Sequence, residues 1–410
     1  MAHPVQKSPL RTIAPLLAMT GVSLLATDMY LPSIPHLQMQ LGGTLSQAQA
    51  TLPVFFITFA LCQLLHGTLA DTFGKFRVLV GAAGVFLFAT VLAAMASDIT
   101  ILTLARALQG AGAAAATAIV PAVIRSSFNE ATSIRLMSWL GMAESLVPAL
   151  GPFLGAYILI WFNWRASFWL LAICGVLSLL MLLSNRRIYS DGASTTRRQI
   201  AWSEVFTSYG EVIQTRAFIG YALGYASAFG ALMSIVGIAP HLLQNLYGYG
   251  PQAFGIMQIV LVAAFMAGSM GASAAAQSLG LRTTIAIGLA LLGSTGFFLT
   301  MIALQIIPST PASFTLAVIP SQIGLGLRFG VSMSAAIGSV PSRPSSASAM
   351  ASFMCFALAA LGNTLTAIWI EDALGATALA CVAFTLCSFF AFCITPRDSR
   401  RIQSENEATS

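Results

Sequence analysis

The sequence predicts an all-α membrane protein whose twelve spans form two related bundles of six helices. Three observations support this prediction: the composition, a succession of long apolar stretches and an internal repeat. Of the 410 residues, 57% are hydrophobic and 8% are charged, whereas a soluble domain carries roughly 25% charged residues. The apolar runs are continuous and do not alternate with polar residues, which argues against a β-barrel.

The twelve spans are read from the length of the apolar stretches. A membrane-spanning helix needs about 20 apolar residues, and membrane helices tolerate the Gly and Pro found inside these stretches. We expect spans near residues 12–34, 49–70, 77–97, 99–124, 135–161, 166–184, 217–241, 252–277, 283–306, 312–340, 346–370 and 374–395.

The two halves of the chain are related by a shift of 205 residues. Under this shift Arg11 meets Arg216 and Arg77 meets Arg282, and further matches gather at corresponding span ends. These are Pro35-His36-Leu37 with Pro240-His241-Leu242, Leu41 with Leu246, Gly43 with Gly248, and Gln47-Ala48 with Gln252-Ala253. Two parallel repeats around an axis along the membrane normal are a known transporter architecture.

The cations predict the topology. Nearly all of them fall in loops that are cytoplasmic when the N-terminus is inside, and Arg165 alone falls outside. The cytoplasmic set is Lys7, Arg11, Lys75, Arg77, Arg125, Arg135, Arg186, Arg187, Arg197, Arg198, Arg216, Arg282, Arg343, Arg397, Arg400 and Arg401. This placement explains the net charge of +6 without nucleic-acid binding.

The domain organisation follows from the longest polar segment. We expect a first six-helix bundle over 1–184, a cytoplasmic central loop over 185–215, a second bundle over 216–396 and a cytoplasmic tail over 397–410. The central loop is either disordered or contains an amphipathic helix near 202–213. The apolar stretch that follows residues 1–11 is too long for a signal-peptide core, so we expect it to be retained as the first span.

Three ionisable residues inside spans are candidates for proton coupling: Asp28, Arg106 and Glu144. A membrane-embedded acid costs about 2.5–3.5 kcal/mol on insertion scales, so it is functional by default. Asp28 and Arg106 lie at matched depth, roughly 10 Å below the outer face at 1.5 Å per residue, which makes an ion pair geometrically possible. The alternatives are an Asp28 that caps its helix or reaches the interface, and structural roles for Arg106 and Glu144.

Candidate substrate contacts are Glu144, which would bind substrate or a second proton, a buried cation and several aromatic side chains. Arg328 in span ten would hold an anionic substrate or neutralise Glu144, and the sequence does not choose between these roles. Tyr221, Tyr225 and Phe229 form a stripe on span seven, on the face that the 205-residue shift makes equivalent to the face of Asp28. We expect this stripe to line a cavity, with lipid-facing or packed aromatics as the alternative.

Several short motifs carry a family resemblance. The turn Gly67-Thr68-Leu69-Ala70-Asp71-Thr72-Phe73-Gly74-Lys75-Phe76-Arg77 resembles the loop between spans two and three of the major facilitator superfamily. The run from Arg106 to Gly110 resembles the R-x-x-Q-G pattern of span four, which is associated with proton coupling. The run from Pro148 to Gly155 resembles the G-P-x-x-G antiporter motif of span five. The resemblance implies the major facilitator fold, with gating roles for Gly67, Asp71, Gly74, Lys75, Arg77, Pro148, Gly151, Pro152 and Gly155.

A narrower resemblance is to the twelve-span drug:proton antiporters, in particular the bicyclomycin-resistance and chloramphenicol/florfenicol exporter group. It rests on Asp28-Met29-Tyr30-Leu31-Pro32, on Trp164 to Phe168 before span six, and on Tyr247 to Gly255 before span eight. The resemblance implies alternating access, with Asp28 as proton carrier and Arg106 as its modulator. Tyr30, Tyr225 and Phe229 would then supply the apolar stacking surface of a drug site.

The resulting expectation is a proton-coupled exporter of small, mostly apolar compounds such as phenicol antibiotics, in the bacterial inner membrane with both termini cytoplasmic. It would use the proton gradient without a cofactor or metal, and work as a monomer. Alternatives on the same fold are an exporter of an endogenous, possibly anionic metabolite and a proton symporter. A receptor without transport would not need the buried charges, and the chain lacks the P-loop of an ATPase and the H-E-x-x-H and G-x-S-x-G motifs of hydrolytic enzymes. No C-x-x-C motif suggests a metal or disulfide role for the six cysteines.

Overall fold

The described part of the chain is helical throughout and divides into two compact units. A computed structural model describes residues 9–128, 130–186 and 202–396, and contains helices and turns but no strand over these ranges. Unit 1 covers residues 1–200 and unit 2 covers residues 201–410. Residues 187–201 of the predicted central loop and the whole predicted tail, 397–410, lie outside the described ranges.

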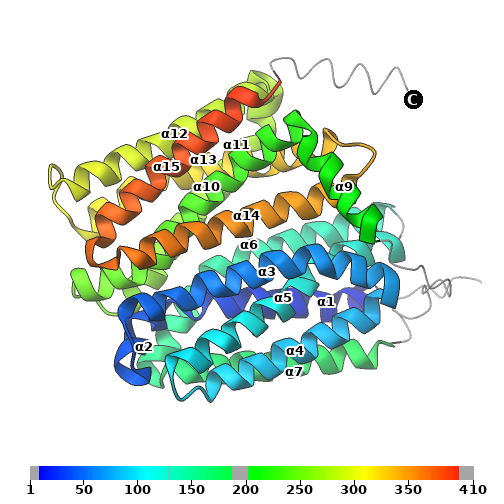
Figure 1. Cartoon of the computed structure of the whole chain (residues 1–410), viewed down its shortest axis with the longest axis horizontal. Coiled ribbons are helices and arrows are strands. Elements are labelled where there is room, and N and C mark those ends of the chain that lie inside the picture. Colours follow the sequence, from blue (N-terminus) through cyan, green and yellow to red (C-terminus); the bar gives the residue numbers. More distant parts are fainter. Residues whose placement is uncertain (1–8, 129, 187–201, 397–410) are drawn as a thin grey trace, which may run out of the picture. The chain divides into compact units, whose positions relative to one another are not determined.

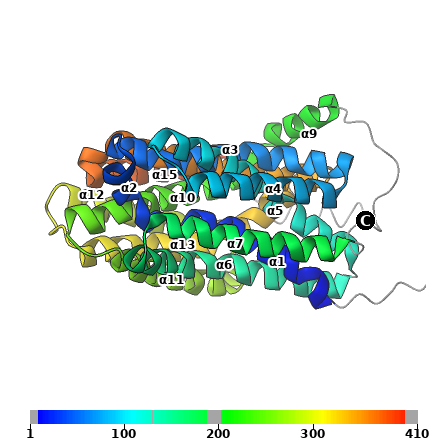
Figure 2. The ribbon, with the colours of Figure 1, turned by 90° about the horizontal axis from the view of Figure 1, so that it is seen from below.

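Unit 1 is built from long helices that lie side by side (Figures 1 and 2). Its α5 packs against both α3 and α4, while α1 packs against α5, α6 and α7. The elements are α1 (Pro9–Asp28), the short 3-10 helix η1 (Leu31–Ser33), α2 (Ile34–Leu41), α3 (Leu45–Phe73), α4 (Lys75–Ala94), α5 (Ile99–Ser127), α6 (Glu130–Trp161) and α7 (Trp164–Ser184).

Unit 2 repeats this arrangement after one additional short helix. Its α10 packs against α13, α14 and α15, and α13 also packs against α11 and α12. The elements are α9 (Trp202–Gln214), α10 (Arg216–His241), the π-helical turn η2 (Leu242–Leu246), α11 (Gln252–Leu279), α12 (Leu281–Ala303), α13 (Pro311–Gly338), α14 (Pro344–Ile368), η3 (Ile370–Asp372) and α15 (Ala373–Ile394).

Twelve segments of the described chain are long and apolar enough to cross a membrane, which confirms the predicted number of spans. The first span differs from the prediction in form. It was expected near 12–34, but its apolar segment extends over Ile13–Leu41 and its helix is interrupted after Asp28. Pro32 and Pro35 each lie in the first turn of a new helix, where the missing N–H costs least.

Glycines with positive φ mark equivalent turns in the two units. Gly74 joins α3 to α4 with φ 90°, and Gly280 joins α11 to α12 with φ 86°. Gly42 and Gly248, both with φ 72°, follow the ends of the first and seventh spans. Each pair is separated by 206 residues, one more than the shift of the sequence repeat, so the repeat extends to backbone conformation. A side chain other than Gly adopts this left-handed region at a cost.

Close helix contacts on α5 depend on two glycines. A methyl group added at Gly110 would meet the backbone oxygen of Phe55 on α3, and one at Gly112 would meet the backbone nitrogen of Phe86 on α4 at 2.6 Å. Small residues let membrane helices approach at backbone distance. The spans around Arg106 are therefore held tightly on both sides.

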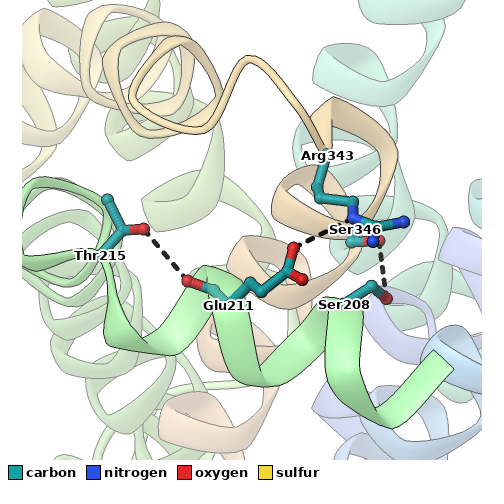
Figure 3. Close-up of polar contacts among 5 residues, drawn as sticks. All are labelled: Ser208, Glu211, Thr215, Arg343 and Ser346. Atoms are coloured by element: carbon teal, nitrogen blue, oxygen red, sulfur yellow. Dashed lines mark hydrogen bonds and ion pairs between the residues drawn. The ribbon is translucent and has the colours of Figure 1, made fainter. Parts of the chain in front are cut away.

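The helix α9 settles the alternatives that the sequence left open for residues 202–213. It packs on α10 and α14, with Val212 fully buried in a cluster that includes Phe218 and Ala347. Figure 3 shows its polar contacts: Glu211 Oε2 accepts from Arg343 Nε at 3.1 Å, and Ser208 Oγ accepts from Ser346 Oγ at 3.2 Å. Because both charged partners are exposed, the ion pair contributes little, and the buried Val212 anchors the helix.

Candidate functional site: a carboxyl and a buried arginine around the first span

Asp28 is the last residue of α1, and its Cβ atom lies against α6. A methyl group added at Gly151 would come within 2.7 Å of Asp28 Cβ, and one added at Gly155 would meet the backbone of Met29. The two glycines of the G-P-x-x-G run therefore let α6 approach the end of α1 at backbone distance. The structure thus brings together two motifs that the sequence analysis described separately.

Arg106 lies on α5 and is fully buried. Its Nη1 donates to the backbone oxygen of Ala26 at 2.9 Å and also to Gln109 Oε1. Gln109 Nε2 in turn donates to Thr90 Oγ1 on α4 at 2.9 Å, and Thr90 donates to Phe86 O at 2.7 Å. A chain of polar contacts therefore links the guanidinium of Arg106 to both α1 and α4.

Two aromatic rings complete the surroundings of Arg106. The guanidinium carbon lies 4.6 Å from the ring centre of Tyr30 and 4.3 Å from that of Phe55. Both distances fall within the range of cation–π attraction, which gains strength when the cation is desolvated. We call Tyr30 and Phe55 the aromatic seat of Arg106.

Asp28 and Arg106 form no ion pair in the part of the chain that the structure describes. Their depth is matched, but the contacts of α1 place them on different faces. Arg106 contacts the backbone oxygen of Ala26 and the ring of Tyr30, which lies in the turn after α1. Asp28 is rotated about 200° from Ala26 around the helix axis and faces α6 instead. Counting residues along each helix thus predicted how deep the two side chains lie, but not toward which neighbouring helix each one points.

Glu144 is half-buried on α6, on the same helix as Gly151 and Gly155, and has no hydrogen bond or ion pair among the described residues. Pro148 and Pro152 lie inside α6 without ending it, so the helix runs unbroken from Glu130 to Trp161. The structure gives Glu144 no contact with Asp28, Arg106 or any other charged group that it describes.

The turn between α3 and α4 is attached to α5. Gly74 supplies the positive φ of the turn, and Lys75 Nζ donates to the backbone oxygen of Ala122 at 3.1 Å. Gly67 lies inside α3 with open space around its Cα, and Arg77 is exposed. The side chain of Asp71 lies outside what the structure describes. The attachment through Lys75 links the motif to the same helix that carries Arg106.

Unit 2 has its own buried arginine. Arg328 on α13 is 1% exposed; its Nη1 donates to Ser388 Oγ and its Nη2 to the backbone oxygen of Gly224, both at 2.9 Å. Ser388 also donates to the oxygen of Gly224 at 3.0 Å. Arg328 therefore joins α13 to α10 and α15. The sequence from Arg216 to Trp369 contains no Asp or Glu, so these neutral groups are its polar partners within the unit.

The predicted aromatic stripe is in part a packing surface. Tyr221 and Tyr225 are buried and line a small cavity within unit 2, together with Gly224, Ser332 and Ser388. The ring of Tyr225 also packs edge-on against Phe329 at 5.0 Å.

Phe229, the third member of the stripe, is half-buried and packs edge-on against Phe356 at 5.7 Å. The first two residues of the stripe are thus close to the partners of Arg328, whereas Phe229 belongs to the contact of α10 with α14.

Sequence reasoning missed Phe55, Thr51, Thr90 and Ser388. All four are uncharged residues of apolar spans, where one Phe or Thr resembles any other. The only signal available was indirect, because a buried arginine requires partners and neighbouring spans must supply them. In the described ranges no three His, Cys, Asp or Glu side chains gather in a way that would hold a metal ion.

The twelve spans, the two repeated units and the charges buried within them define a membrane transporter of the secondary type. The sequence profile of the Major Facilitator Superfamily matches residues 16–363. The chain therefore belongs to the major facilitator superfamily, as the motifs predicted, and is a multi-pass transporter and not an enzyme.

Two curated bacterial relatives have names that refer to resistance. A "Chloramphenicol resistance protein" of Pseudomonas aeruginosa is 29% identical over 268 residues, which are 63% of this chain and 61% of the relative. The match thus spans less than two thirds of that relative's length. The "Multidrug resistance protein MdtL" of Escherichia coli is 25% identical over 315 residues, 76% of each protein. These names agree with the predicted drug-exporter group.

A solved structure supports the fold alone. The peptide transporter POT in complex with sulfate superimposes with a TM-score of 0.76, covering 98% of this chain and 96% of that one, at 13% identity. The predicted major facilitator fold is therefore confirmed.

Proposed function

We propose that this protein is a proton-coupled exporter of small, mostly apolar compounds, such as phenicol antibiotics, that works by alternating access. The observation that carries the proposal is Asp28, a carboxyl within the first span whose Cβ lies against Gly151 of the antiporter motif, while Gly155 lies against the backbone of the next residue, Met29. A carrier that exchanges substrate for a proton needs a protonatable group inside the membrane, next to a helix contact that changes with conformation.

The roles of the residues follow from their places. Asp28 carries the proton, Arg106 modulates it, and Glu144 is a second acid for substrate or proton. Tyr221, Tyr225 and Phe229 provide apolar contact to the substrate. The turn residues Gly67, Asp71, Gly74, Lys75 and Arg77 and the α6 residues Pro148, Gly151, Pro152 and Gly155 serve conformational change.

The names of the two relatives support this choice of substrate class, since one is named for chloramphenicol resistance and the other for multidrug resistance. In this proposal the protein resides in the bacterial inner membrane as a monomer, with both termini in the cytoplasm. The proton gradient is the energy source and no cofactor takes part.

A second candidate function is export of an anionic metabolite. It is favoured by Arg328, a buried cation whose described partners are neutral and whose Nε has no hydrogen-bond partner among the described residues. A buried cation gains from an opposite charge in a low-dielectric site. Drugs that are neutral or cationic would gain nothing from it.

The test is transport in inside-out membrane vesicles, with labelled chloramphenicol and a labelled small carboxylate as probes. Respiration acidifies the vesicle lumen, so the proposal predicts that chloramphenicol accumulates and that a protonophore or Asp28→Asn abolishes the accumulation. Glu371→Gln is the matched control, because this exposed acid at a span end lies in unit 2. If the carboxylate alone accumulates, the proposed substrate is an anion and not a drug. If vesicles loaded with a compound lose it together with protons that leave the acidic lumen, the protein is a symporter.

A further inference from the structure

The end of α1 has an unusual cap. Met29 N–H makes the last hydrogen bond of the helix, to Leu25 O at 3.0 Å. The next carbonyl, of Ala26, accepts from Arg106 on another helix. Carbonyl groups in the last turn of a helix carry a partial negative charge and are stabilised by a cation. Arg106 therefore acts as a C-terminal cap for α1, two residues before Asp28.

The aromatic seat has a fixed orientation. The hydroxyl of Tyr30 lies 2.7 Å from Thr51 Oγ1 on α3, and Thr51 donates its own hydrogen to Ala48 O at 2.6 Å. Tyr30 is therefore the donor to Thr51. On its other side the ring packs against Phe168 of α7 at 5.4 Å. With 1% exposure and contacts from three helices, the ring of Tyr30 has one placement.

The guanidinium has donors to spare. Its Nε and Nη2 are buried and make no hydrogen bond in the described part of the chain. Within the described residues the positive charge of Arg106 is therefore stabilised by two neutral acceptors, Ala26 O and Gln109 Oε1, and by the faces of two aromatic rings. The aromatic seat therefore keeps a flexible side chain with free N–H groups away from the face of α1 where Asp28, the one acid of that helix, lies against α6.

We propose that Tyr30 and Phe55 are positioning residues that hold Arg106 on the Ala26 carbonyl, so that Arg106 acts on Asp28 through the capped helix end and not through an ion pair. This inference rests on the proposed proton exchange at Asp28. It gives Tyr30 a role different from the substrate contact that its aromatic character suggested. Thr51 supports the role by orienting the ring.

The other charged groups near this helix end are few. The helices packed against α1 are α5, α6 and α7. Their charged side chains within the described spans are Arg106 and Arg125 on α5, Arg135 and Glu144 on α6, and Arg165 at the start of α7; Tyr157 on α6 and Cys174 on α7 are titratable but neutral. Arg125 and Arg135 lie at the opposite membrane end of their helices from Asp28, and Arg165 donates to Ala96 O. Arg106 is thus the cation best placed to affect Asp28.

The experiment measures proton release on adding chloramphenicol to purified protein across a range of pH, together with the dissociation constant for chloramphenicol. Tyr30→Leu removes a π face and lets Arg106 approach Asp28. The midpoint pH of release should therefore fall by about one unit, because an opposite charge favours the carboxylate. Phe55→Leu should act in the same direction. Tyr30→Phe keeps the face and should remain near the parent, and the dissociation constant should change less than about threefold in each.

Tyr157→Leu is the matched control, since Tyr157 is a tyrosine of the same unit that packs on Phe153 and Trp161 and makes no cation–π contact within the described residues. Its midpoint should match the parent. A Tyr30→Leu protein with an unchanged midpoint and a roughly tenfold weaker chloramphenicol affinity would make Tyr30 a substrate contact and overturn the proposal.

A second measurement distinguishes failure of the proposed function from failure of the proposed role of Tyr30 and Phe55. If the parent releases no proton with any compound, the proposed function fails, and a thermal double-mutant cycle of Tyr30→Leu with Arg106→Met still tests the seat. Coupling between the two changes is expected, whereas additive effects would show that the ring does not hold Arg106.

Discussion

The two units each bury one arginine on their fourth span, and each arginine donates to a backbone carbonyl of its unit's first span. Arg106 does so about 10 Å into α5, at the end of α1, whereas Arg328 does so about 26 Å into α13, at a point about 12 Å into α10. The guanidinium of Arg106 contacts aromatic rings, and its carbonyl partner lies two residues before the carboxyl of Asp28. The guanidinium of Arg328 donates to Ser388, and residues 216–369 of its unit contain no acidic residue. The same feature thus has aromatic rings and a carboxyl two residues from its carbonyl partner in the first unit, and neutral polar partners in the second. We propose that it serves proton exchange in the first unit and helix packing in the second.

The largest expected difference follows from replacing each arginine by methionine. Arg106→Met removes the cap beside Asp28 and should lower proton-driven chloramphenicol export on the order of tenfold or more. Arg328→Met should leave export near the parent level, because the described partners of Arg328 are neutral and its replacement leaves no opposite charge buried without a partner. Vesicle transport, with thermal unfolding as a check on folding, measures both. Export lost equally in a well-folded Arg328→Met protein would support an anionic substrate.

A smaller difference is expected at the close glycine contacts. A methyl group at Gly155 would meet the backbone of Met29, and one at Gly326 would meet the backbone oxygen of Phe265. Gly155→Ala and Gly326→Ala should each destabilise the protein by about 1–3 kcal/mol. Only Gly155→Ala should also shift the pH of proton release, since only it displaces the end of α1.

Gly141→Ala is the control for these substitutions, because a methyl group added at Gly141 on α6 would meet no described atom within 4 Å. It should be neutral or slightly stabilising in thermal unfolding, since Ala favours a helix over Gly by about 1 kcal/mol. A shift of proton release with Gly326→Ala would remove the distinction between the two contacts.

A still smaller effect is expected at Ser388. Ser388→Ala removes one acceptor for Arg328 and one donor to Gly224 O, while Arg328 keeps its own bond to that oxygen. The expected loss is about 1 kcal/mol of unfolding free energy with unchanged export. Thermal unfolding of the purified protein measures it. Loss of transport without loss of stability would show that this network serves function and not packing.

The smallest expected effect concerns the N-terminal caps of α5 and α13, the two helices that carry the buried arginines. The N–H groups of Ile101 and Thr100 and the Ser97 hydroxyl hold the pKa of Asp98, the N-cap of α5, below its usual value. The corresponding cap of α13 is Thr310, which does not titrate. Because the folded-state pKa of Asp98 is depressed, its contribution to stability is present above the unfolded pKa of about 3.9 and is lost as the pH falls through the folded value.

Asp98→Ser should therefore flatten the acid side of the stability curve below about pH 4, and Thr310→Ser should not change it. Thermal unfolding as a function of pH compares the two. Equal acid sensitivity of the parent and Asp98→Ser would show that other carboxyls dominate in this range.

The sequence was sufficient for the fold and the number of spans, and it supplied the ionisable candidates of the site, whose roles stay predictions. Apolar stretches, loop cations and the repeat predicted twelve spans in two halves because length and charge are properties that a membrane constrains directly. Motif spacing marked Arg106 and the glycines of α6. It did not predict that these glycines contact Asp28 and Met29, since the rotation of one helix against another depends on many side chains at once.

The direction of Asp28 is the clearest example. Its depth relative to Arg106 followed from counting residues, but the break after Asp28 and the facing of α1 were set by Pro32, Pro35 and the contact with α6. Tyr30 illustrates the same point, because the sequence indicated an aromatic surface and the structure shows which charge it faces.

The central claim is that Asp28 exchanges a proton for substrate. It is tested most directly by proton release from purified parent and Asp28→Asn protein on adding phenicols, lipophilic cations and small carboxylates, with Asp98→Asn as a matched acid outside the spans. Release by a phenicol or a lipophilic cation that is lost in Asp28→Asn and kept in Asp98→Asn is the predicted result. Unchanged release in Asp28→Asn would contradict the claim and transfer the proton site to Glu144.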